Sequence, residues 1–247
     1  MLKTFLGADS CKAGWFTVLL SEDNDWKVDV FPDVSNLWNK YNSASMILLD
    51  VPIGLRERGP EERLCDIEAR KLLSPKRRSS VFAAPCRQAV SAKTYEKASN
   101  INKQMTGRRL SRQTWNIIPK IREVDTLLSN DESARSRIRE IHPEICFWAL
   151  AGHPMKHSKK TKKGFSERMQ LLESVYPHTN DMVDHAISTY RRNEVARDDI
   201  LDALSAAVTA IVGVQSLISI PETVEFDSQG LRMEMLYCPY HTGCGSI

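Results

Sequence analysis

The chain has 247 residues, of which 42% are hydrophobic and 26% are charged, and its formal net charge is +3. This composition is that of an ordinary globular protein, and it excludes a largely disordered chain. No apolar run reaches the roughly 18 residues that a membrane helix requires, and residues 1–10 lack the apolar core of a secretion signal. We therefore expect a cytoplasmic protein with no membrane partner, in which the six widely spaced cysteines are free thiols.

The first fifty residues have the pattern of strands in a sheet. Residues 3–9 and 15–21 are apolar runs separated by a glycine-containing break, and residues 26–33 alternate apolar and polar side chains. These segments predict a three-strand antiparallel meander. Residues 34–42 predict a short helix, and residues 45–51 predict a continuous apolar strand, which is typical of the buried, parallel part of a sheet.

The next ninety residues are rich in Arg, Lys, Ser and Gln, and they have helical patterns at residues 61–73, 94–105 and 113–128. We interpret residues 56–135 as a helical insertion between two strands of the sheet, not as a separate unit. The whole chain, residues 1–247, is then one α/β domain with a mixed sheet flanked by helices.

The second half of the chain returns to the sheet and its covering helices. A strand within residues 135–144 is expected to end near residues 142–144, because Pro143 donates no backbone hydrogen bond. Four helices and a hairpin that turns at residues 228–230 should follow. The helices are predicted at residues 144–152, 164–176, 180–192 and 198–218, and the hairpin at residues 222–237.

Carboxylates stand at the ends of two predicted strands. Asp9 follows the first strand, and Asp50 ends the apolar strand. Strand ends at one edge of an α/β sheet face the same crevice, so neighbouring parallel strands would bring these acids together. Asp199 and Asp202 share one face of the last helix, because they are three residues apart. Carboxylates this close repel, and Mg²⁺ or Mn²⁺ would relieve the repulsion.

Such a set of acids predicts a site for two ions about 4 Å apart, which would clamp the attacking and leaving oxygens of a phosphoryl displacement. Each acid also has a structural interpretation. An Asp after a strand is commonly a turn residue, and Asp198 is the expected N-cap of the last helix. Glu144 could favour the start of its helix through the macrodipole. The arrangement as a whole favours a site more than any single member does.

Five groups of motifs resemble one known family. In chain order they are "LGADSCKAGWF", "LLDVPIGL", "CDIEARKLL" with "SSVFAAPCR", "HPEICFWALAG" with "KKTKKGFSERMQLL", and "DDILDALSAA". From residue 5 to residue 210 the chain resembles the family named domain of unknown function 429, also written DUF429. Members of that family are predicted nucleases of the ribonuclease H-like fold, so the resemblance implies this fold and nuclease activity.

The resemblance also implies roles for individual acids. The resemblance implies that Asp9 corresponds to the family's acid on the first strand and that Asp50 corresponds to its acid on the fourth strand. Asp199 and Asp202 form a D-x-x-D pair similar to that of the Holliday-junction resolvases, which share the fold. Glu144 matches the "HPE" motif, as a fifth catalytic acid or as an organiser at the rim of the site.

Basic residues in these motifs are candidates for contacts with a phosphate backbone. Arg63 and Arg70 lie on one face of a predicted helix, where they either form ion pairs within the insertion or clamp phosphate. Lys159 and Lys160 precede a helix start, a favourable place for phosphate oxygens, and an exposed basic loop is the alternative. Arg87 completes this set.

We therefore expect metal-dependent hydrolysis of phosphodiester bonds in nucleic acid, with two Mg²⁺ or Mn²⁺ ions held by the four aspartates. A non-catalytic scaffold of the same fold that binds nucleic acid or protein is the alternative. An ATP-dependent phosphotransferase is a third, against which the lack of a glycine-rich phosphate loop counts. The sequence leaves open the type of nucleic acid and the oligomeric state. Cys238, His241 and Cys244 give only a weak zinc pattern, because a fourth ligand is missing.

Overall fold

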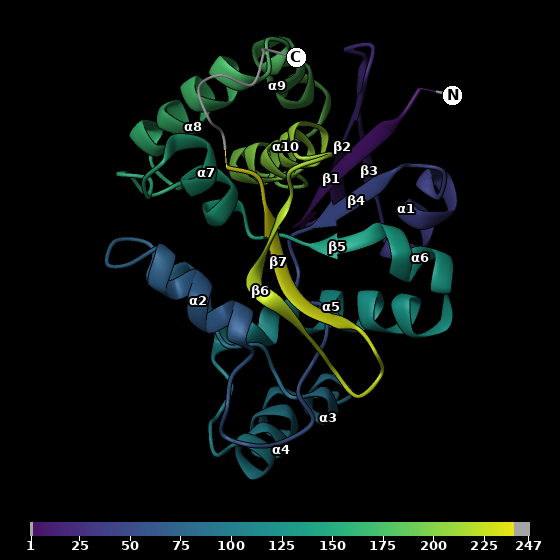
Figure 1. The fold of residues 1–247 in the computed structure, drawn as a ribbon, viewed down its shortest axis with the longest axis vertical. Coiled ribbons are helices and arrows are strands. Elements are labelled where there is room, and N and C mark those ends of the chain that lie inside the picture. Colours follow the sequence, from purple (N-terminus) through teal and green to yellow (C-terminus); the bar gives the residue numbers. More distant parts are fainter. Residues whose placement is uncertain (1, 240–247) are drawn as a thin grey trace.

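The computed structural model describes residues 2–239, and a five-stranded mixed sheet lies at its centre (Figure 1). The strands in chain order are β1 (Thr4–Cys11), β2 (Gly14–Ser21), β3 (Trp26–Phe31), β4 (Met46–Leu49) and β5 (Ile138–Glu140). Their spatial order is β3-β2-β1-β4-β5. The first three pair antiparallel, and β4 pairs in parallel with both β1 and β5. This is a ribonuclease H-like topology, which confirms the predicted meander and parallel strands.

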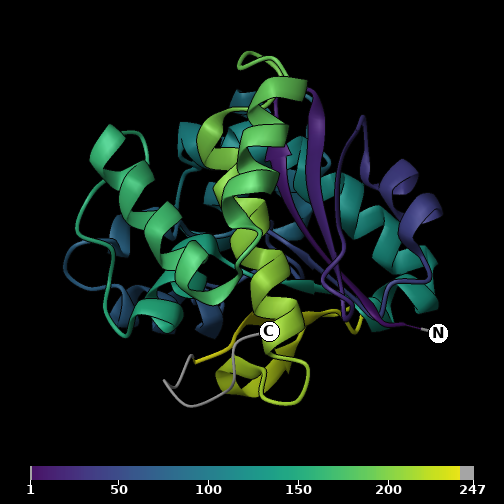
Figure 2. The same ribbon diagram turned by 90° about the horizontal axis from the view of Figure 1, so that it is seen from above.

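Helices cover both faces of the sheet, which explains why its central strands are apolar on both sides. On one face, Leu6 and Ala8 of β1 pack with α1 (Val34–Tyr41) and α5 (Arg112–Asn130). On the other face, β2 packs with four helices of the second half of the chain. They are α7 (Pro143–Ala151), α8 (Lys162–Val175), α9 (Thr179–Thr189) and α10 (Arg197–Val212). Helix α10 runs along the strands, as the view from above shows (Figure 2).

The chain between β4 and β5 forms the helical insertion. Besides α5 it contains α2 (Leu64–Leu72), a 3-10 turn (Arg78–Ser80), α3 (Arg87–Val90), α4 (Tyr95–Thr106) and α6 (Glu132–Arg137). Helices α3 and α4 lie at the end of the molecule farthest from α9 (Figure 1). Buried residues of α4 and α5 belong to the same apolar core as the sheet face that they adjoin, so the insertion packs on the sheet.

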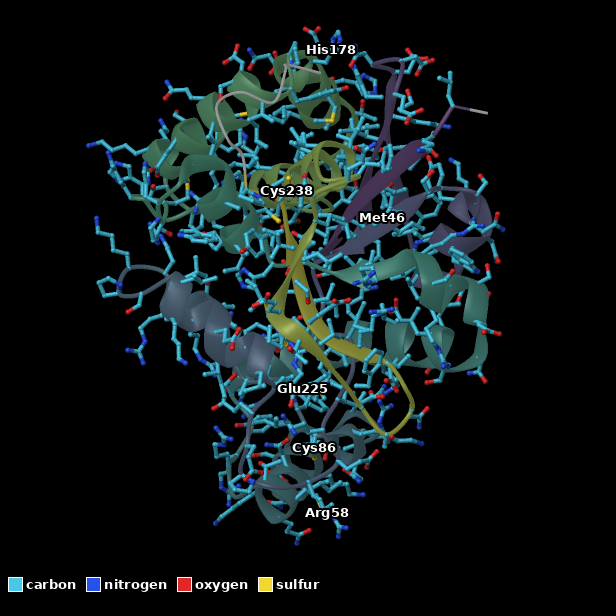
Figure 3. The ribbon with its side chains drawn as sticks, in the orientation of Figure 1. Met46, Arg58, Cys86, His178, Glu225 and Cys238 are labelled. Carbon is cyan, nitrogen blue, oxygen red and sulfur yellow. The ribbon has the colours of Figure 1, made fainter. Side chains whose placement is uncertain are left out.

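A C-terminal hairpin, β6 (Ile218–Phe226) and β7 (Arg232–Tyr237), forms a second sheet of two strands. It confirms the predicted hairpin, and a single bridge joins Leu236 to Ile141 just after β5. Cys86 in the insertion and Cys238 after the hairpin lie far apart (Figure 3). The thiols of Cys11, Cys65, Cys86 and Cys146 are free.

Several element boundaries differ from the predictions, and two of the differences have a clear physical reason. The strand expected to end near residues 142–144 ends at Glu140, because His142 already caps α7 and Pro143 occupies its first helical position. The last helix ends at Val212 and not at residue 218, because Ile218 pairs with Tyr237 in the hairpin. None of the helices within residues 2–239 is long and apolar enough to cross a membrane.

Candidate metal centre

Asp9 and Asp50 are neighbours because the strands that carry them pair in parallel. The register of β1 and β4 aligns Ala8 with Leu49, so the next residue on each strand is one of the two acids. The N–H of Asp50 donates to the carbonyl oxygen of Ala8 over 3.1 Å, which continues the pairing one residue beyond β4. The strands are therefore adjacent and parallel, as predicted, and both acids lie at the carboxyl edge of the sheet.

Helix α10 brings Asp202 to the same edge, and Gly7 makes this approach possible. Gly7 and Asp9 lie on the same face of β1, two residues apart. A Cβ atom on Gly7 would lie 2.2 Å from the carbonyl oxygen of Ala203 and 2.2 Å from the backbone nitrogen of Ala207. Any side chain at position 7 would therefore push the helix backbone away from the strand. The bare glycine lets α10 hold Asp202, the residue before Ala203, close to Asp9.

Asp9, Asp50 and Asp202 form a compact group of oxygen donors. Each offers one carboxylate oxygen, and the three oxygens lie within 4.8 Å of one another. Asp9 and Asp202 are 5% and 1% exposed, whereas Asp50 is half-buried. Hard oxygen ligands suit Mg²⁺ and Mn²⁺. The three carboxylates could hold a metal ion, and no other such group of three occurs in the part of the chain that the structure describes.

The protein makes these carboxyl groups difficult to ionise. Burial raises the pKa of Asp9 well above its ordinary value, and the charges of Asp50 and Asp202 raise it further. Burial also raises the pKa of Asp50 to about 7, with Lys159 opposing the rise and Asp202 adding to it. A divalent cation among the three would remove the mutual repulsion and favour the ionised form of each group.

Two lysines of the loop between α7 and α8 reach the acids of α10. Lys159 forms an ion pair with Asp202, and its ammonium nitrogen lies 3.8 Å from a carboxylate oxygen of Asp198. Lys160, whose side chain is 70% exposed, pairs with Asp198. Burial alone would lower the pKa of Lys159, but Asp202 and Asp9 raise it well above its ordinary value. Both lysines that were predicted to bind phosphate thus contact acids in this structure.

The start of α10 differs from the prediction. Its N-cap is Ala196, so the expectation that Asp198 caps the helix is wrong. Asp199 instead accepts the N–H of Ala196 over 2.8 Å, which leaves Asp198 in the first turn and facing the lysines. Asp199 lines the same cavity as the three acids, and burial raises its pKa to about 6. Its carboxylate is not part of the group of three oxygen donors.

Glu144 lies in the first turn of α7 and lines the same cavity. The Nδ1 atom of His142, which caps the helix, accepts the N–H of Glu144 over 3.2 Å. The Oε1 atom of Glu144 accepts a hydrogen bond of 2.5 Å from Arg168. Its Oε2 atom is buried and has no hydrogen-bond partner among residues 2–239. Buried polar atoms are nearly always satisfied, so this oxygen is available to a water molecule or to a ligand.

Arg168 is an organising residue that sequence reasoning missed. It is 1% exposed, and besides Glu144 it donates to the carbonyl oxygens of His157 and Gly164 over 3.1 and 3.0 Å. It thereby contacts the backbone on both sides of Lys159 and Lys160, in the loop at His157 and in α8 at Gly164. One signal could have revealed it, because Arg168 lies at a core position on α8, between buried Gly164 and Leu172.

Arg63 lies beside the cavity in a buried ion-pair network. It is 2% exposed, and its three guanidinium nitrogens donate to Asp66, Glu140 and the carbonyl oxygen of Ile53. Glu140, at the end of β5, also accepts the N–H of Ile53 over 2.6 Å. Burial raises the pKa of Glu140 to about 7, and Arg63 opposes that rise. These contacts favour the ion-pair interpretation of Arg63 over the phosphate clamp.

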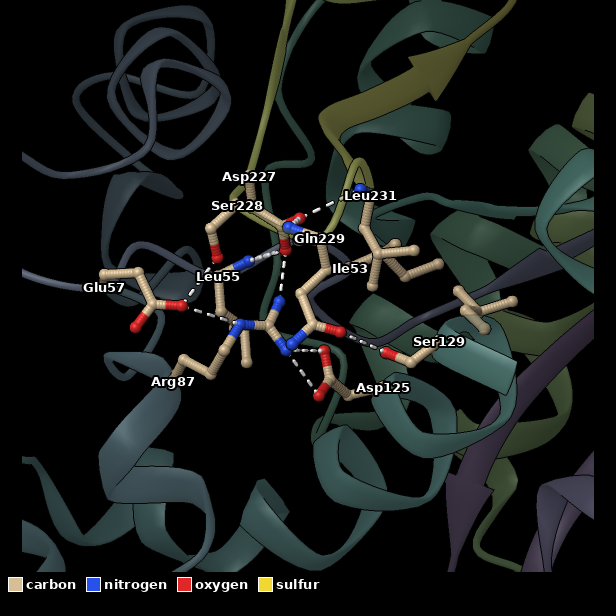
Figure 4. A network of polar contacts seen from close by, with 12 residues as sticks. Ile53, Leu55, Glu57, Arg87, Asp125, Ser129, Asp227, Ser228, Gln229 and Leu231 are labelled. Atoms are coloured by element: carbon tan, nitrogen blue, oxygen red, sulfur yellow. Dashed lines mark hydrogen bonds and ion pairs between the residues drawn. The ribbon is translucent and has the colours of Figure 1, made fainter. Parts of the chain in front are cut away.

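Arg70 and Arg87 also have acidic partners. Arg70 forms an ion pair with Glu62. Arg87 lies at the centre of a network (Figure 4) whose carboxylates are Glu57, Asp125 and Asp227. Neither arginine lines the cavity that contains the aspartates, so their positions favour ion pairs over contacts with a phosphate there.

A cavity of about 420 Å³ contains the acids and two basic segments. The segment between α2 and α3 contributes Lys76, Arg77, Ser79 and Ser80, and the loop between α7 and α8 contributes Ser158, Lys159 and Lys160. The Nε atom of Arg77 donates to the carbonyl oxygen of Met155 over 3.0 Å, which joins the two segments. They lie on the same side of the molecule in both views (Figures 1 and 2).

The weak zinc pattern falls mostly outside the described residues, since His241 and Cys244 lie beyond residue 239.

A family model described as "Protein of unknown function (DUF429)" matches residues 7–225, from β1 into β6. A search of curated proteins and a search of solved structures each found no match. The matched span includes every acid of the metal centre. The resemblance of the motifs is confirmed, and the chain belongs to the DUF429 family.

Proposed function

We propose that the protein hydrolyses phosphodiester bonds of nucleic acid with Mg²⁺ or Mn²⁺ held by Asp9, Asp50 and Asp202. The observation that carries this proposal is the convergence of three carboxylate oxygens within 4.8 Å at the carboxyl edge of the sheet. The acids come from two strands and one helix that are far apart in the sequence. Their crowding is unfavourable in the protein alone, as the raised pKa of Asp9 indicates.

A second ion is part of the proposal. Asp199 lines the cavity beside the group of three, and Glu144 has a buried oxygen without a partner within the described chain. Carboxylates of this kind are suitable ligands for another hard cation. We assign Asp199 and Glu144 to it. The sequence predicted Asp199 as a metal ligand and Glu144 as a fifth acid or an organiser at the rim of the site.

The reaction adds water across one P–O bond. The water oxygen bonds to phosphorus, and the leaving oxygen departs with a proton. When bound, the two ions supply Lewis-acid stabilisation of the charge that develops on the phosphate. The chain's own residues fix the ligands, because strand pairing holds Asp9 and Asp50 and the contact at Gly7 holds Asp202.

The basic segments around the cavity support an anionic polymer as substrate. Lys160 is largely exposed, and Lys76 has no ion-pair partner within residues 2–239. Both line the cavity that contains the acids. Lysines in such positions neutralise phosphates and make binding sensitive to salt. No regular series of aromatic side chains lines this cavity, so the proposed contacts are with phosphates and not with bases.

The test uses labelled single-stranded and duplex DNA and RNA, together with a branched DNA. We expect cleavage with Mn²⁺ or Mg²⁺, no cleavage with a chelator, and loss of cleavage to background in Asp9→Asn. Circular dichroism should show that this variant is folded. The matched control is Asp184→Asn, which removes an exposed acid of α9 and should leave cleavage unchanged.

Two other results would point to other functions. Binding of nucleic acid without cleavage under any metal condition would favour a scaffold. Metal-dependent consumption of ATP, abolished by Asp9→Asn, would favour a phosphotransferase. Either result would overturn the proposed hydrolysis.

A further inference from the structure

Among residues 2–239, Lys159 is the one lysine or arginine that forms an ion pair with a member of the three-acid group. Its ammonium group pairs with Asp202, which is 1% exposed. Asp9 and Asp50 also act on it electrostatically. A single lysine thus compensates charges of both strands and of α10. This is the electrostatic task that a divalent ion would perform at the same carboxylates.

The backbone that carries Lys159 is held in place, whereas its side chain has freedom. Arg168 donates to carbonyl oxygens on both sides of it, those of His157 and Gly164. Glu167 accepts the backbone N–H groups of Lys156 and His157 over 2.8 and 2.9 Å. The side chain of Lys159 is 34% exposed. Four methylene groups let its ammonium move by several ångströms while the loop remains fixed.

Other cations near the cavity do not share this position. Lys160 contacts Asp198 and none of the three acids, and Arg63 is committed to Asp66 and Glu140. Lys163, four residues along the chain, is exposed in the first turn of α8. Of these residues, only Lys159 is in a position to be replaced by a metal ion at the three acids.

We infer that Lys159 is an exchangeable internal counter-ion: it occupies the carboxylates of the metal centre until a divalent ion displaces its ammonium group into the cavity. Lys159 and the ion thus compete for Asp202, and the lysine sets the apparent affinity for metal. The displaced ammonium remains in the cavity, where it can meet a phosphate. This inference rests on the metal centre of the proposed function and adds the exchange to it.

The first test follows the reactivity of Lys159 in the wild-type protein. Lysines are acylated briefly with an amine-reactive reagent in chelator or in Mn²⁺, and mass spectrometry gives the extent at each position. We expect labelling of Lys159 to rise when Mn²⁺ is present, because the ammonium leaves Asp202. Labelling of Lys160 and Lys163 should change little.

The second test compares Lys159→Met with Lys163→Met, two variants that each lose one positive charge from the same region. Calorimetric titration should show Mn²⁺ binding to Lys159→Met roughly tenfold or more tightly than to the wild type, since a close competing charge is gone. Its melting temperature in chelator should fall, and Mn²⁺ should restore it. Lys163→Met should change neither quantity by a similar amount.

The outcomes separate the two proposals. If the wild type binds no Mn²⁺, the metal centre and the exchange both fail. If it binds Mn²⁺, and Asp9→Asn does not, the metal centre stands. Unchanged labelling of Lys159, or Mn²⁺ affinity in Lys159→Met equal to or weaker than the wild type, would then overturn the exchange alone. The labelling test needs no variant, so a folding defect in Lys159→Met leaves the inference testable.

Discussion

Asp50 shows how burial links the protonation of one carboxyl group to the stability of the fold. Its pKa is raised to about 7, first by burial and further by Asp202. In the unfolded chain an aspartic acid titrates near pH 4. Between about pH 4 and pH 7 the folded protein therefore binds a proton that the unfolded chain has released. The pKa values of Asp9 and Asp199 are also raised, so these groups change the free energy of unfolding with pH in the same direction as Asp50 does.

We predict that the free energy of unfolding of the ion-free protein falls as pH rises through this window. One carboxyl group contributes a slope of at most about 1.4 kcal/mol per pH unit, because it binds one proton more in the folded state. Urea unfolding in chelator at pH 5, 6 and 7 measures the slope. Asp50→Asn should reduce it, and excess Mn²⁺ should reverse it. An equal slope in wild type and Asp50→Asn would contradict this prediction.

At the scale of elements, the contact between β1 and α10 determines whether the acids converge. We predict that Gly7→Ala lowers stability by about 1–3 kcal/mol and weakens Mn²⁺ binding. The added methyl group would meet backbone atoms of Ala203 and Ala207, so the helix must move, and Asp202 moves with it. Urea unfolding and Mn²⁺ titration measure the two effects.

The control for this prediction is Leu6→Ala, which removes core volume on the other face of β1, against α1 and α5. It should cost about 2–5 kcal/mol of stability while Mn²⁺ affinity is retained. Were Gly7→Ala to bind Mn²⁺ as tightly as the wild type, the close contact would not be what places Asp202.

The same contact shows what sequence could predict. The apolar and alternating patterns placed Asp9 and Asp50 at strand ends, and the ribonuclease H-like fold implied by the family resemblance made a common edge the expectation. Gly7 could not be recognised as a contact point, since the approach of α10 is a tertiary event. Arg168 and Glu140 were missed for a related reason. Their roles depend on buried partners distant in the sequence, Glu144 and Arg63.

Local rules also failed where tertiary contacts compete with them. Asp198 is a good N-cap by residue type, but the lysine loop takes its carboxylate and the helix starts two residues earlier. Arg63 has a suitable geometry for phosphate, but Asp66 and Glu140 occupy its donors. In both cases one partner lies on an element distant in the sequence, Lys160 for Asp198 and Glu140 for Arg63, which no short window of sequence contains.

At the scale of the whole molecule, Arg87 joins segments that are far apart in the chain. Its partners are Glu57 after β4, Asp125 on α5 and Asp227 at the tip of the hairpin (Figure 4). Asp227 has a fully buried side chain and also accepts the N–H of Leu55 over 2.9 Å. Removing Arg87 leaves the buried carboxylate of Asp227 without its cation, which is strongly unfavourable.

We predict that Arg87→Met destabilises the protein by about 3–5 kcal/mol. Hydrogen exchange should increase in α3 and at the turn of the hairpin, because both lose the shared contact. The control is Lys40→Met, which removes an exposed partner of Asp29 and should cost less than about 1 kcal/mol. Equal effects of the two substitutions would show that the network contributes no more than a surface ion pair.

The Arg87 network also bears on how the protein matures on the ribosome. Glu57, Arg87 and Asp125 emerge during synthesis of the insertion, whereas Asp227 is translated only after β5 and helices α7 to α10. A nascent chain that stops short of the hairpin exposes a guanidinium without its most buried acceptor, and the N–H of Leu55 lacks its carboxylate. This contact between the insertion and the hairpin therefore forms only after the hairpin has been translated, and a chain that stops before the hairpin should be more sensitive to protease.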